Sequence, residues 1–464
     1  MNILLIEPKR SIYTSTTLSN KFYAIPHLGL LSIAANLESD GHMVDYFSTN
    51  SYRDPLRSLD RVLRRGYDYV GLSTVGNTID FQLGMASAVK EYSTKTKVVL
   101  GGTHAWLNPG EVLEDPNVDF VIRGFGEMPF KRLIAGQSLD SIPGLCYNQE
   151  NKVVIKAPYL PDQNELNQLK SILDYSKYEK VYSRVETFRN QRQLVTSFGC
   201  PFGCNFCSVP KMYGGKMLFR DLTQVLAEVR ELSKRTSRIF FQDPNLNVDR
   251  NHFTNLFTGI LERKKTGEIQ KKVKFLIQAR IDCFDDDLLR LAKRANVGAL
   301  IGIESLSQRV RDTDLNKGGM LARMSKEELI EQMDKVSEYI PIFPYFILAT
   351  PETREQDLIE TLSYISSLKK GRCEVDNYIT PFKGTDYFSK CKDSDLMVWR
   401  EYATGSGTKT IPDGLLCKDK RVVDRIYKAF SKAVKKHKKN PRSSFKSIFL
   451  ADLIEDAGFK PAGG

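Results

Sequence analysis

The chain has 464 residues, of which 41% are hydrophobic and 27% charged, and it carries a net charge of +12. This length predicts two or three globular domains. No apolar run approaches the ~18 residues of a membrane helix, and the N-terminus "MNILLIEPKR" is unlike a signal peptide. The eight cysteines show no disulfide pattern, since five stand singly at 146, 283, 373, 391 and 417. We therefore expect a cytoplasmic enzyme.

Residues 1–140 are predicted to form a first domain built on a doubly wound parallel sheet. Short apolar runs that end in small residues alternate there with helical stretches such as "DFQLGMASAVKEY". These runs are residues 3–6, "MVDYFS", "YVGLSTV" and "KVVLGGTHA". Ligands of such sheets bind at the carboxyl ends of the strands.

The strand ends of this domain offer candidate ligand contacts. Their glycines let the backbone approach a flat or phosphate-bearing ligand, and the absence of a GxGxxG fingerprint disfavours a dinucleotide. The candidates are Ser73, Thr74, Val75, Gly101, Gly102, Thr103, His104, Gly124, Gly126 and Glu127.

A second series of alternating strands and helices is predicted over residues 191–388, after a polar linker at 141–190. Six strand-like runs are enough for most of a (β/α)8 barrel but not for a complete one, so we expect a partial (β/α)6 barrel. A mainly helical segment on the substrate side should follow at 389–464. Polar residues stand just after the strands, at the catalytic face of this architecture: Asp243, Asn245, Gln278, Arg280 and Glu304.

The loop "TSFGCPFGCNFCSVP" holds Cys200, Cys204 and Cys207, and no fourth cysteine follows nearby. A structural zinc site and an ordinary iron–sulfur cluster both require four ligands. A zinc knuckle is the plain alternative, but the next imidazole, His252, lies far along the chain without paired spacing. Three thiolates on a 4Fe–4S cluster leave one iron open, which could bind the amino-acid head of S-adenosylmethionine (SAM) and pass it one electron.

The spacing Cys200-x-x-x-Cys204-x-Phe206-Cys207 after a first strand resembles the radical SAM superfamily, and the resemblance extends over roughly residues 190–385. It implies that Phe206 meets the adenine of SAM. It also implies that the stretch "DPN" holds the methionyl amine, and that polar residues after the next strands contact the carboxylate and ribose. The residues concerned are Asp243, Asn245, Gln278, Arg280 and Glu304, with Arg220 as a further candidate near the cofactors.

Three of these residues have plain alternatives. Asp243 could cap a helix or a turn. Arg280 could pair with Asp282, and Arg220 could be an exposed cap at a helix start.

The segments "FILATPETREQDLIETL" and "TPFKGT" resemble the fifth and sixth strands of the branch that carries a cobalamin domain. That branch usually has Gly-x-Pro-Gly-Glu-Thr at this point. The corresponding stretch here, "ATPET" at 349–353, lacks both glycines, so the resemblance is weaker for the backbone contacts of this loop. The phrases "IPHLGLLSIAANLESDGH", "GLSTV", "VVLGGTHA" and "DFVIRGFGE" resemble the cobalamin domain itself.

One departure concerns the lower ligand of cobalt. The Asp-x-His-x-x-Gly motif begins at Asp40-Gly41-His42, but Asp45 stands where its glycine should be. The resemblance therefore implies that the lower face of the cobalt lacks a histidine ligand. His104 is expected to line the pocket rather than to bind cobalt.

The resemblance implies a cobalamin-dependent radical SAM enzyme, most simply a C-methyltransferase at an unactivated carbon. One SAM would yield a 5′-deoxyadenosyl radical, methylcobalamin would give its methyl group to the substrate radical, and a second SAM would remethylate cob(I)alamin. The expected partners are a flavodoxin- or ferredoxin-type electron donor and a small-molecule, lipid or peptide substrate. Three alternatives remain: a non-methylating enzyme that forms, contracts or hydroxylates rings; a coupling enzyme on lipids without cobalamin; and a non-catalytic zinc or cobalamin carrier.

The positive charge is concentrated near the C-terminus, where residues 420–446 hold eleven Lys or Arg and one acid, Asp424. Val422, Ile426, Phe430 and Val434 form one apolar stripe at helical spacing. This predicts a helix that packs its stripe on the barrel or, alternatively, contacts an anionic membrane. Nucleic acid is disfavoured, because aromatic residues are not interleaved with the charges.

Overall fold

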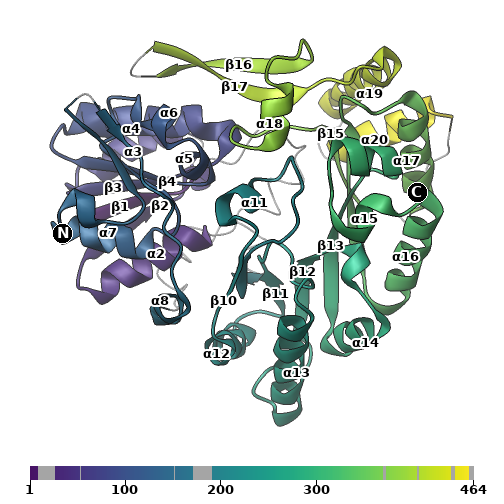
Figure 1. Ribbon diagram of the computed structural model, residues 1–464, viewed down its shortest axis with the longest axis horizontal. Helices are drawn as coiled ribbons and strands as arrows, with labels where there is room; N and C mark the ends of the chain where they lie inside the picture. Colours follow the sequence, from purple (N-terminus) through teal and green to yellow (C-terminus); the bar gives the residue numbers. More distant parts are fainter. Residues whose placement is uncertain are drawn as a thin grey trace.

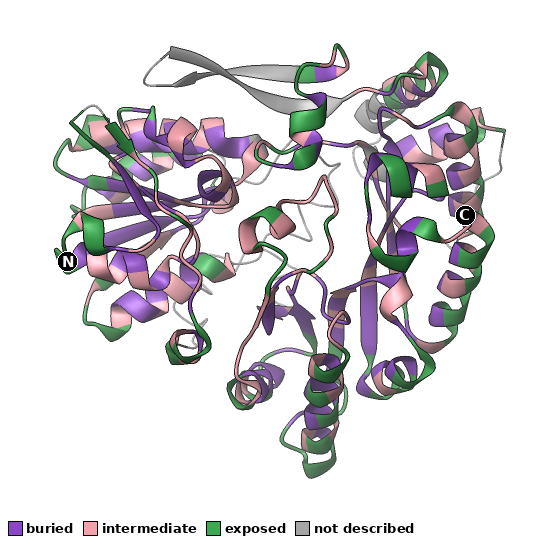
Figure 2. Cartoon of the chain, viewed as in Figure 1, coloured by how far each residue is buried: buried purple, intermediate pink, exposed green. Residues whose placement is uncertain are grey.

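The computed structural model describes residues 1–8, 27–52, 54–150, 152–170, 191–368, 373–404, 407–439 and 445–458. Two α/β domains lie side by side, and the C-terminal segment runs over both of them (Figure 1). Most strands of the two sheets are buried beneath helices that are exposed on their outer faces (Figure 2). Among the described residues, no helix is both long and apolar enough to cross a membrane.

The first domain contains a seven-stranded sheet in the order β2-β1-β3-β4-β5-β6-β7, parallel from β2 to β5. Ile3 and Leu5 of β1 pack with α2 and α7 on one face, whereas Leu4 and Ile6 pack with α3 and α4 on the other. This is the predicted doubly wound arrangement. The elements are β1 (Asn2–Ile6), α2 (Leu28–Ser39), β2 (Met43–Phe47), α3 (Pro55–Leu63), β3 (Tyr69–Thr74), α4 (Ile79–Tyr92), β4 (Lys97–Gly102), α5 (Thr103–Leu107), α6 (Pro109–Leu113), β5 (Phe120–Ile122) and α7 (Glu127–Ile134).

The predicted linker at 141–190 is wrong in its first part. β6 (Leu145–Gln149) and β7 (Lys152–Val154) add two antiparallel strands to the first sheet, and α8 (Gln163–Gln168) follows. Leu145, Cys146 and Tyr147 are buried, so they complete the core of the first domain, which therefore extends beyond residue 140. The end of the predicted linker, 171–190, lies outside the described residues.

The second domain has the predicted partial barrel of six strands, all parallel, in the order β15-β14-β13-β12-β11-β8. Helices follow the strands and cover their outer side (Figure 1). The elements are β8 (Arg192–Leu194), α12 (Leu222–Ser233), β11 (Arg238–Phe241), α13 (Arg250–Thr266), β12 (Lys274–Ala279), α14 (Asp286–Ala295), β13 (Val297–Glu304), α15 (Gly319–Arg323), α16 (Lys326–Tyr339), β14 (Ile342–Ala349), α17 (Glu355–Ser367) and β15 (Glu374–Tyr378).

The cysteine loop lies in an insertion between β8 and α12. β9 (Ser197–Gly199) enters the loop, α11 (Ser208–Tyr213) leaves it, and β10 (Met217–Phe219) returns to pair antiparallel with β9. Gly199 lies between these strands with φ +85°, and a Cβ there would come within 2.0 Å of the carbonyl oxygen of Lys216. Only glycine fits this position, so Gly199 fixes how the chain enters the loop.

The C-terminal segment contains the predicted helices and also a hairpin that the sequence did not predict. The helices are α18 (Asp386–Cys391), α19 (Lys420–Lys439) and α20 (Phe445–Asp456). The hairpin, β16 (Met397–Thr404) with β17 (Gly407–Leu415), lies against α4 and the short helix η2 (Gly76–Thr78) of the first domain. The C-terminal segment therefore contacts both domains.

The basic helix α19 packs its apolar stripe into the protein core. Val422 and Ile426 are buried in the main hydrophobic core, and Phe430 is 42% exposed with its ring 6.5 Å from that of Phe449. The side chain of Val434 lies outside the described residues. Cations of the outer face pair with acids of α20 and α17, including Lys432 with Asp456 and Arg425 with Glu355. The structure therefore agrees with the packing alternative for this helix.

This packing predicts how two substitutions on α19 differ. Ile426→Asp should lower the free energy of unfolding by ~3 kcal/mol or more, because it buries an unpaired charge. Phe430→Asp should cost clearly less, since the side chain is half exposed. Urea melts of both variants measure the difference. Equal, small effects, together with salt-sensitive sedimentation of the wild type with anionic vesicles, would favour a lipid-binding helix instead.

Candidate active site

A pocket of about 250 Å³ opens at the carboxyl ends of β1, β3 and β4. We call it the strand-end pocket. Nine of the ten residues predicted as ligand contacts of the first domain line it. They are Ser73, Thr74, Val75, Gly101, Gly102, Thr103, Gly124, Gly126 and Glu127.

Glycine backbone shapes the floor of the strand-end pocket. Gly102 has φ +87°, and a Cβ there would lie 2.6 Å from the backbone nitrogen and oxygen of Thr74. Gly124 has φ +104° and abuts the backbone of Tyr159. At Gly101, by contrast, the nearest atom to an added Cβ is a carbonyl oxygen 3.8 Å away. The backbone of β4 is therefore open to a ligand at Gly101, where a side chain would occupy the pocket.

The outer wall of the pocket comes from the second domain. Phe198 of β9 and Met212 and Tyr213 of α11 line it together with residues of the first domain. The ring of Tyr213 lies 5.2 Å from that of Trp106, and the ring of Phe198 lies 4.9 Å from that of Phe125. Sequence reasoning missed these residues, because their role depends on contact between domains.

The same insertion carries the three cysteines. Cys200, Cys204 and Cys207 are free thiols of intermediate burial, and α11 begins at the residue after Cys207. No group of three His, Cys, Asp or Glu side chains in the described part of the chain is arranged around a single metal ion. A 4Fe–4S cluster does not need such an arrangement, since each thiolate binds a different iron. Three thiols on one loop therefore fit a cluster better than a zinc ion.

Arg280 supports the cluster loop (residues 200–207) through a ring contact with Phe202 and through hydrogen bonds to residues 317 and 318. Its guanidinium carbon lies 3.7 Å from the ring centroid of Phe202, and it donates to the carbonyls of Lys317 and Gly318 at 2.8 Å each. Asp282 pairs with it at 2.9 Å. The thiol of Cys204 donates to the same carbonyl of Lys317 at 3.1 Å. Arg280 thus forms the predicted alternative ion pair with Asp282, and it also fixes the backbone of residues 317 and 318 beside the cluster loop.

Both halves of the chain match known families. Residues 17–134 match the B12 binding domain, and residues 194–365 match the radical SAM superfamily. The two matches lie on the domain with the strand-end pocket and on the domain with the cluster loop. The chain belongs to the cobalamin-dependent radical SAM enzymes. Its cofactors are cobalamin, a 4Fe–4S cluster and SAM.

Two curated relatives illustrate the range of this family. The chain is 23% identical over 393 residues to an "Uncharacterized methyltransferase PH0819" of Pyrococcus horikoshii, with 82% of each chain covered. It is 25% identical over 388 residues to the anaerobic magnesium-protoporphyrin IX monomethyl ester cyclase of Rubrivivax gelatinosus, covering 78% of this chain and 65% of the cyclase. Relatives of similar distance thus differ in the reaction that their names describe.

Solved structures show the same fold. The radical SAM methyltransferase TsrM of Kitasatospora setae superposes with a TM-score of 0.69 at 16% identity, covering 86% of this chain and 78% of TsrM. The cobalamin-dependent radical SAM enzyme OxsB superposes with a TM-score of 0.69 at 15% identity, covering 98% and 71%. The order of a cobalamin domain followed by a partial barrel is therefore that of solved family members.

The histidines of the cobalamin domain lie in three different places. His104 is 2% exposed and turns away from the strand-end pocket, so the prediction that it lines the pocket is wrong. Its Nε2 lies 3.9 Å from a carboxylate oxygen of Glu111. His42 lies at the opposite, amino end of the strands. His27, which sequence reasoning missed, lines the pocket, where its Nδ1 accepts from the Leu30 amide and its Nε2 lies 3.2 Å from the Ser73 hydroxyl.

Burial of His104 predicts a pH dependence of stability. Desolvation lowers its pKa from the usual 6.5 to about 4. Between pH 6.5 and 4, His104 is therefore protonated in the unfolded chain but neutral in the folded protein. The free energy of unfolding keeps its full His104 contribution above pH 6.5 and falls by up to about 3 kcal/mol as the pH drops toward 4. His104→Gln should flatten this part of the curve in urea melts. Equal slopes for wild type and His104→Gln would contradict this account.

The predicted SAM contacts gather at the carboxyl ends of the barrel strands. Glu304 ends β13 with the uncommon φ of +62°, and its carboxylate accepts from Lys317 Nζ at 2.8 Å. That Nζ lies 5.7 Å from the ring of Phe206. Gln278 lies near the end of β12. Glu304 is therefore linked to the cluster loop through Lys317, and contact of these residues with SAM stays a prediction.

Asp243 and Asn245 differ in what they offer to SAM. Asp243 is fully buried, and its carboxylate accepts from the Thr196 amide and from the hydroxyls of Thr196 and Ser197. Its bonds therefore fix the strand that leads into the cluster loop. Asn245 is 5% exposed, and its side-chain oxygen has no hydrogen-bond partner among the described residues. A buried acceptor without a partner fits a ligand donor such as the methionyl amine.

This difference predicts that Asn245→Ala weakens SAM binding by at least about tenfold, the lower end of the value of one hydrogen bond to a charged group. Iron content and melting temperature of the SAM-free protein should stay at the wild-type level, since the variant removes an unpaired acceptor. Asp243→Asn should instead lower the melting temperature. Equilibrium dialysis with SAM and calorimetry distinguish the two. An unchanged SAM affinity in Asn245→Ala would exclude this contact.

Arg220 is not the exposed cap of the plain alternative. It forms an ion pair at 2.6 Å with Glu228, whose side chain is 2% exposed, and donates to the carbonyl of Val195 at 2.8 Å. Its amide donates to the carbonyl of Thr196. Arg220 thus ties the end of β10 to the strand that leads into the cluster loop. A direct contact with a cofactor stays a prediction.

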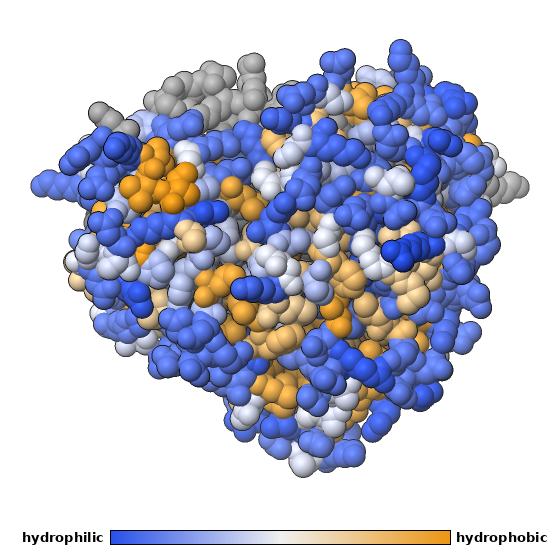
Figure 3. All heavy atoms as spheres, in the orientation of Figure 1, coloured by the Kyte–Doolittle hydropathy of each residue, from blue (hydrophilic) through white to orange (hydrophobic). Residues whose placement is uncertain are grey.

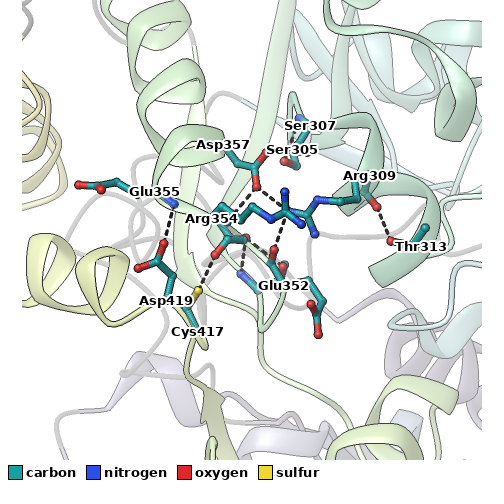
Figure 4. Close-up of polar contacts among 12 residues, drawn as sticks. Ser305, Ser307, Arg309, Thr313, Glu352, Arg354, Glu355, Asp357, Cys417 and Asp419 are labelled. Atoms are coloured by element: carbon teal, nitrogen blue, oxygen red, sulfur yellow. Dashed lines mark hydrogen bonds and ion pairs between the residues drawn. The ribbon is translucent and has the colours of Figure 1, made fainter.

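The loop after β14, residues 350–353, is braced without the family glycines. The amide of Thr350 donates to the hydroxyl of Thr353 at 2.9 Å. Arg309 donates to the carbonyl of Glu352 and to Asp357 at 2.7 Å each, and Cys417 lies against the same loop (Figure 4). Arg309, which is itself held by Asp357 of α17, and Cys417 of the C-terminal segment therefore fix this backbone.

Proposed function

We propose that this chain is a radical SAM C-methyltransferase that uses cobalamin to methylate an unactivated carbon. This proposal rests on one observation: the insertion that carries the three cysteines also lines the strand-end pocket. Cys207 ends the cluster loop, and Tyr213, six residues later, closes the strand-end pocket. A substrate between the domains would meet both cofactors without leaving the site. The relatives named as methyltransferases support the same reading.

The cofactors supply the chemistry when bound: the reduced cluster cleaves SAM to a carbon radical, and cobalamin carries the methyl group. The chain's own residues hold and orient them. The three cysteines would bind the cluster, and Asn245 and Glu304 would fix SAM above it. The open backbone at Gly101 would receive the corrin. Phe198, Met212 and Tyr213 would exclude water from the space between the cofactors.

The site fits a small-molecule or peptide substrate reached from the junction of the two domains. Figure 3 shows hydrophobic side chains along the middle of this face, whereas hydrophilic ones dominate its edges. Such patches mark binding surfaces on soluble proteins. A flavodoxin- or ferredoxin-type donor stays the predicted electron source. The packing of α19 leaves little support for lipid contact.

A non-methylating enzyme is the second candidate, because the cyclase relative shares both domains. The enzyme without cobalamin is less well supported, since the B12 binding domain matches and its predicted contacts line one pocket. A non-catalytic carrier does not account for the open cluster loop.

The deciding experiment needs no substrate. Holoenzyme is reduced anaerobically with SAM that carries a CD₃ group, and the protein-bound corrinoid is extracted for mass spectrometry. A methyltransferase should return a corrinoid that bears CD₃, together with S-adenosylhomocysteine. Formation of 5′-deoxyadenosine without labelled corrinoid would overturn methyl transfer and favour the second candidate.

A further inference from the structure

The segment that follows β15, residues 381–391, contacts both cofactor domains within a few residues. We call it the bridge segment. Its first residues lie against the cobalamin domain, and its last residues, in α18, lie against the cluster loop. Figure 1 shows α18 between the first domain and the barrel, beside α11.

The cobalamin end of the bridge segment packs on the loops around the strand-end pocket. Phe382 covers Gly76, where an added Cβ would lie 2.8 Å from its ring. Lys383 pairs with Glu111 at 2.8 Å, and its carbonyl accepts from Asn108 at 3.2 Å. Gly76 follows Val75 of the pocket lining, so this contact abuts the cobalamin site.

The cluster end of the bridge segment bonds to the cluster loop itself. The amide of Tyr387 donates to the carbonyl of Asn205 at 2.9 Å, and Asn205 lies between Cys204 and Phe206. The side chain of Asn205 donates to the carbonyl of Asp314 at 2.8 Å, and the Tyr387 hydroxyl donates to the carboxylate of Asp314 at 3.1 Å. This end is therefore tied to the cluster loop both directly and through Asp314.

The bridge segment is short and well fixed between these ends. Lys383 and Tyr387 are four residues apart, so their Cα atoms are at most ~15 Å apart. Thr385 and Tyr387 are buried, and the Thr385 hydroxyl accepts from the Phe388 amide at the start of α18. Gly384 has φ +89°, and a Cβ there would lie 2.8 Å from Leu107. A shift at one end must therefore move the other.

We propose that the bridge segment is a positioning element that sets the spacing between the cobalamin and the cluster with its SAM. Transfer between two cofactors needs reacting atoms about 3–3.5 Å apart, and a 1 Å error can cost about 10²-fold in rate. Lys383 is its positioning residue on the cobalamin side. It acts through Glu111 and contacts no cofactor site itself.

Charge reversal tests this proposal. Lys383→Glu sets two carboxylates against each other, and the pair Lys383→Glu with Glu111→Lys restores attraction. Lys392→Glu, at an exposed residue just after α18, is the matched control. In reduced holoenzyme, the cluster enhances the spin relaxation of cob(II)alamin in a distance-dependent way, and EPR power saturation measures this. Cys204→Ala gives the baseline without a cluster.

Lys383→Glu should lose most of the relaxation enhancement and approach the Cys204→Ala baseline, while iron and corrinoid contents stay at the wild-type level. The double reversal should regain the enhancement, and Lys392→Glu should keep it. Lys383→Met, which removes only the charge, should show a smaller loss and replaces Lys383→Glu if that variant does not fold. Wild-type enhancement in both Lys383 variants would overturn the proposal.

A second readout needs no cofactor. The chain has two tryptophans, and Trp106 is 5% exposed beside Tyr213 at the domain junction. In a Trp399→Phe background, Lys383→Glu should shift the Trp106 emission to the red as the junction opens, and the double reversal should restore it. A shift that the double reversal leaves unchanged would mean local unfolding at residue 383, and would also count against the bridge.

Discussion

Cys204→Ala should remove the iron–sulfur cluster and stop the reductive cleavage of SAM. The wild type, prepared anaerobically, should carry about four irons per chain, because three thiolates bind a 4Fe–4S cluster and leave one iron for SAM. With two thiolates on the cluster loop, the variant cannot retain it. Iron analysis and chromatography of 5′-deoxyadenosine measure both effects.

Cys146→Ala is the matched control, since Cys146 is a buried single cysteine of β6 in the first domain. It should keep the iron and the cleavage activity. The Cys204 variant should also retain cobalamin, because its pocket lies on the first domain. Undiminished 5′-deoxyadenosine formation by Cys204→Ala would disprove the assignment of the loop.

Gly101→Leu should abolish cobalamin retention and leave the cluster in place. A Cβ at Gly101 meets no atom closer than 3.8 Å, so the leucine side chain can enter the strand-end pocket without straining the backbone. The space for the corrin is then filled, and affinity should fall at least about tenfold, or by 1.4 kcal/mol or more. Corrinoid absorbance per chain and iron content report the two cofactors separately.

Gly84→Leu serves as the control, because Gly84 lies within α4 with open space around it and outside the pocket. That variant should retain cobalamin. Replacement of Gly102 is a poorer test, since its clash with Thr74 would disturb the fold as well as the pocket. If Gly101→Leu bound cobalamin as the wild type does, the cofactor would have to lie elsewhere.

The sequence was sufficient to predict those elements and site residues whose signal lies within a short stretch of the chain. The apolar runs of β1, β3 and β4 predicted the first sheet, and the three-cysteine spacing predicted the cluster loop. Nine pocket residues could be named in advance because ligands of parallel sheets bind at the carboxyl ends of strands. The strand pair β6 and β7 was missed because its apolar stretch is short and is flanked by polar residues.

The sequence was insufficient where a side chain's partners are distant in the chain. Arg280 bonds to the carbonyl of Lys317, and a single sequence gives no sign of that contact. The wall at Met212 and Tyr213 exists only because the domains meet there. His104 follows two pocket glycines and still turns away, because α5 begins at Thr103 and carries its ring toward Glu111.

The central claim is that one chain holds an open iron–sulfur cluster and cobalamin around a common space. The most direct test is to count both metals on the same anaerobically purified protein and to assay that sample for SAM cleavage. The account predicts about four irons and one cobalt per chain, with 5′-deoxyadenosine formed on reduction. Iron without cobalt, or zinc in place of iron, would contradict it.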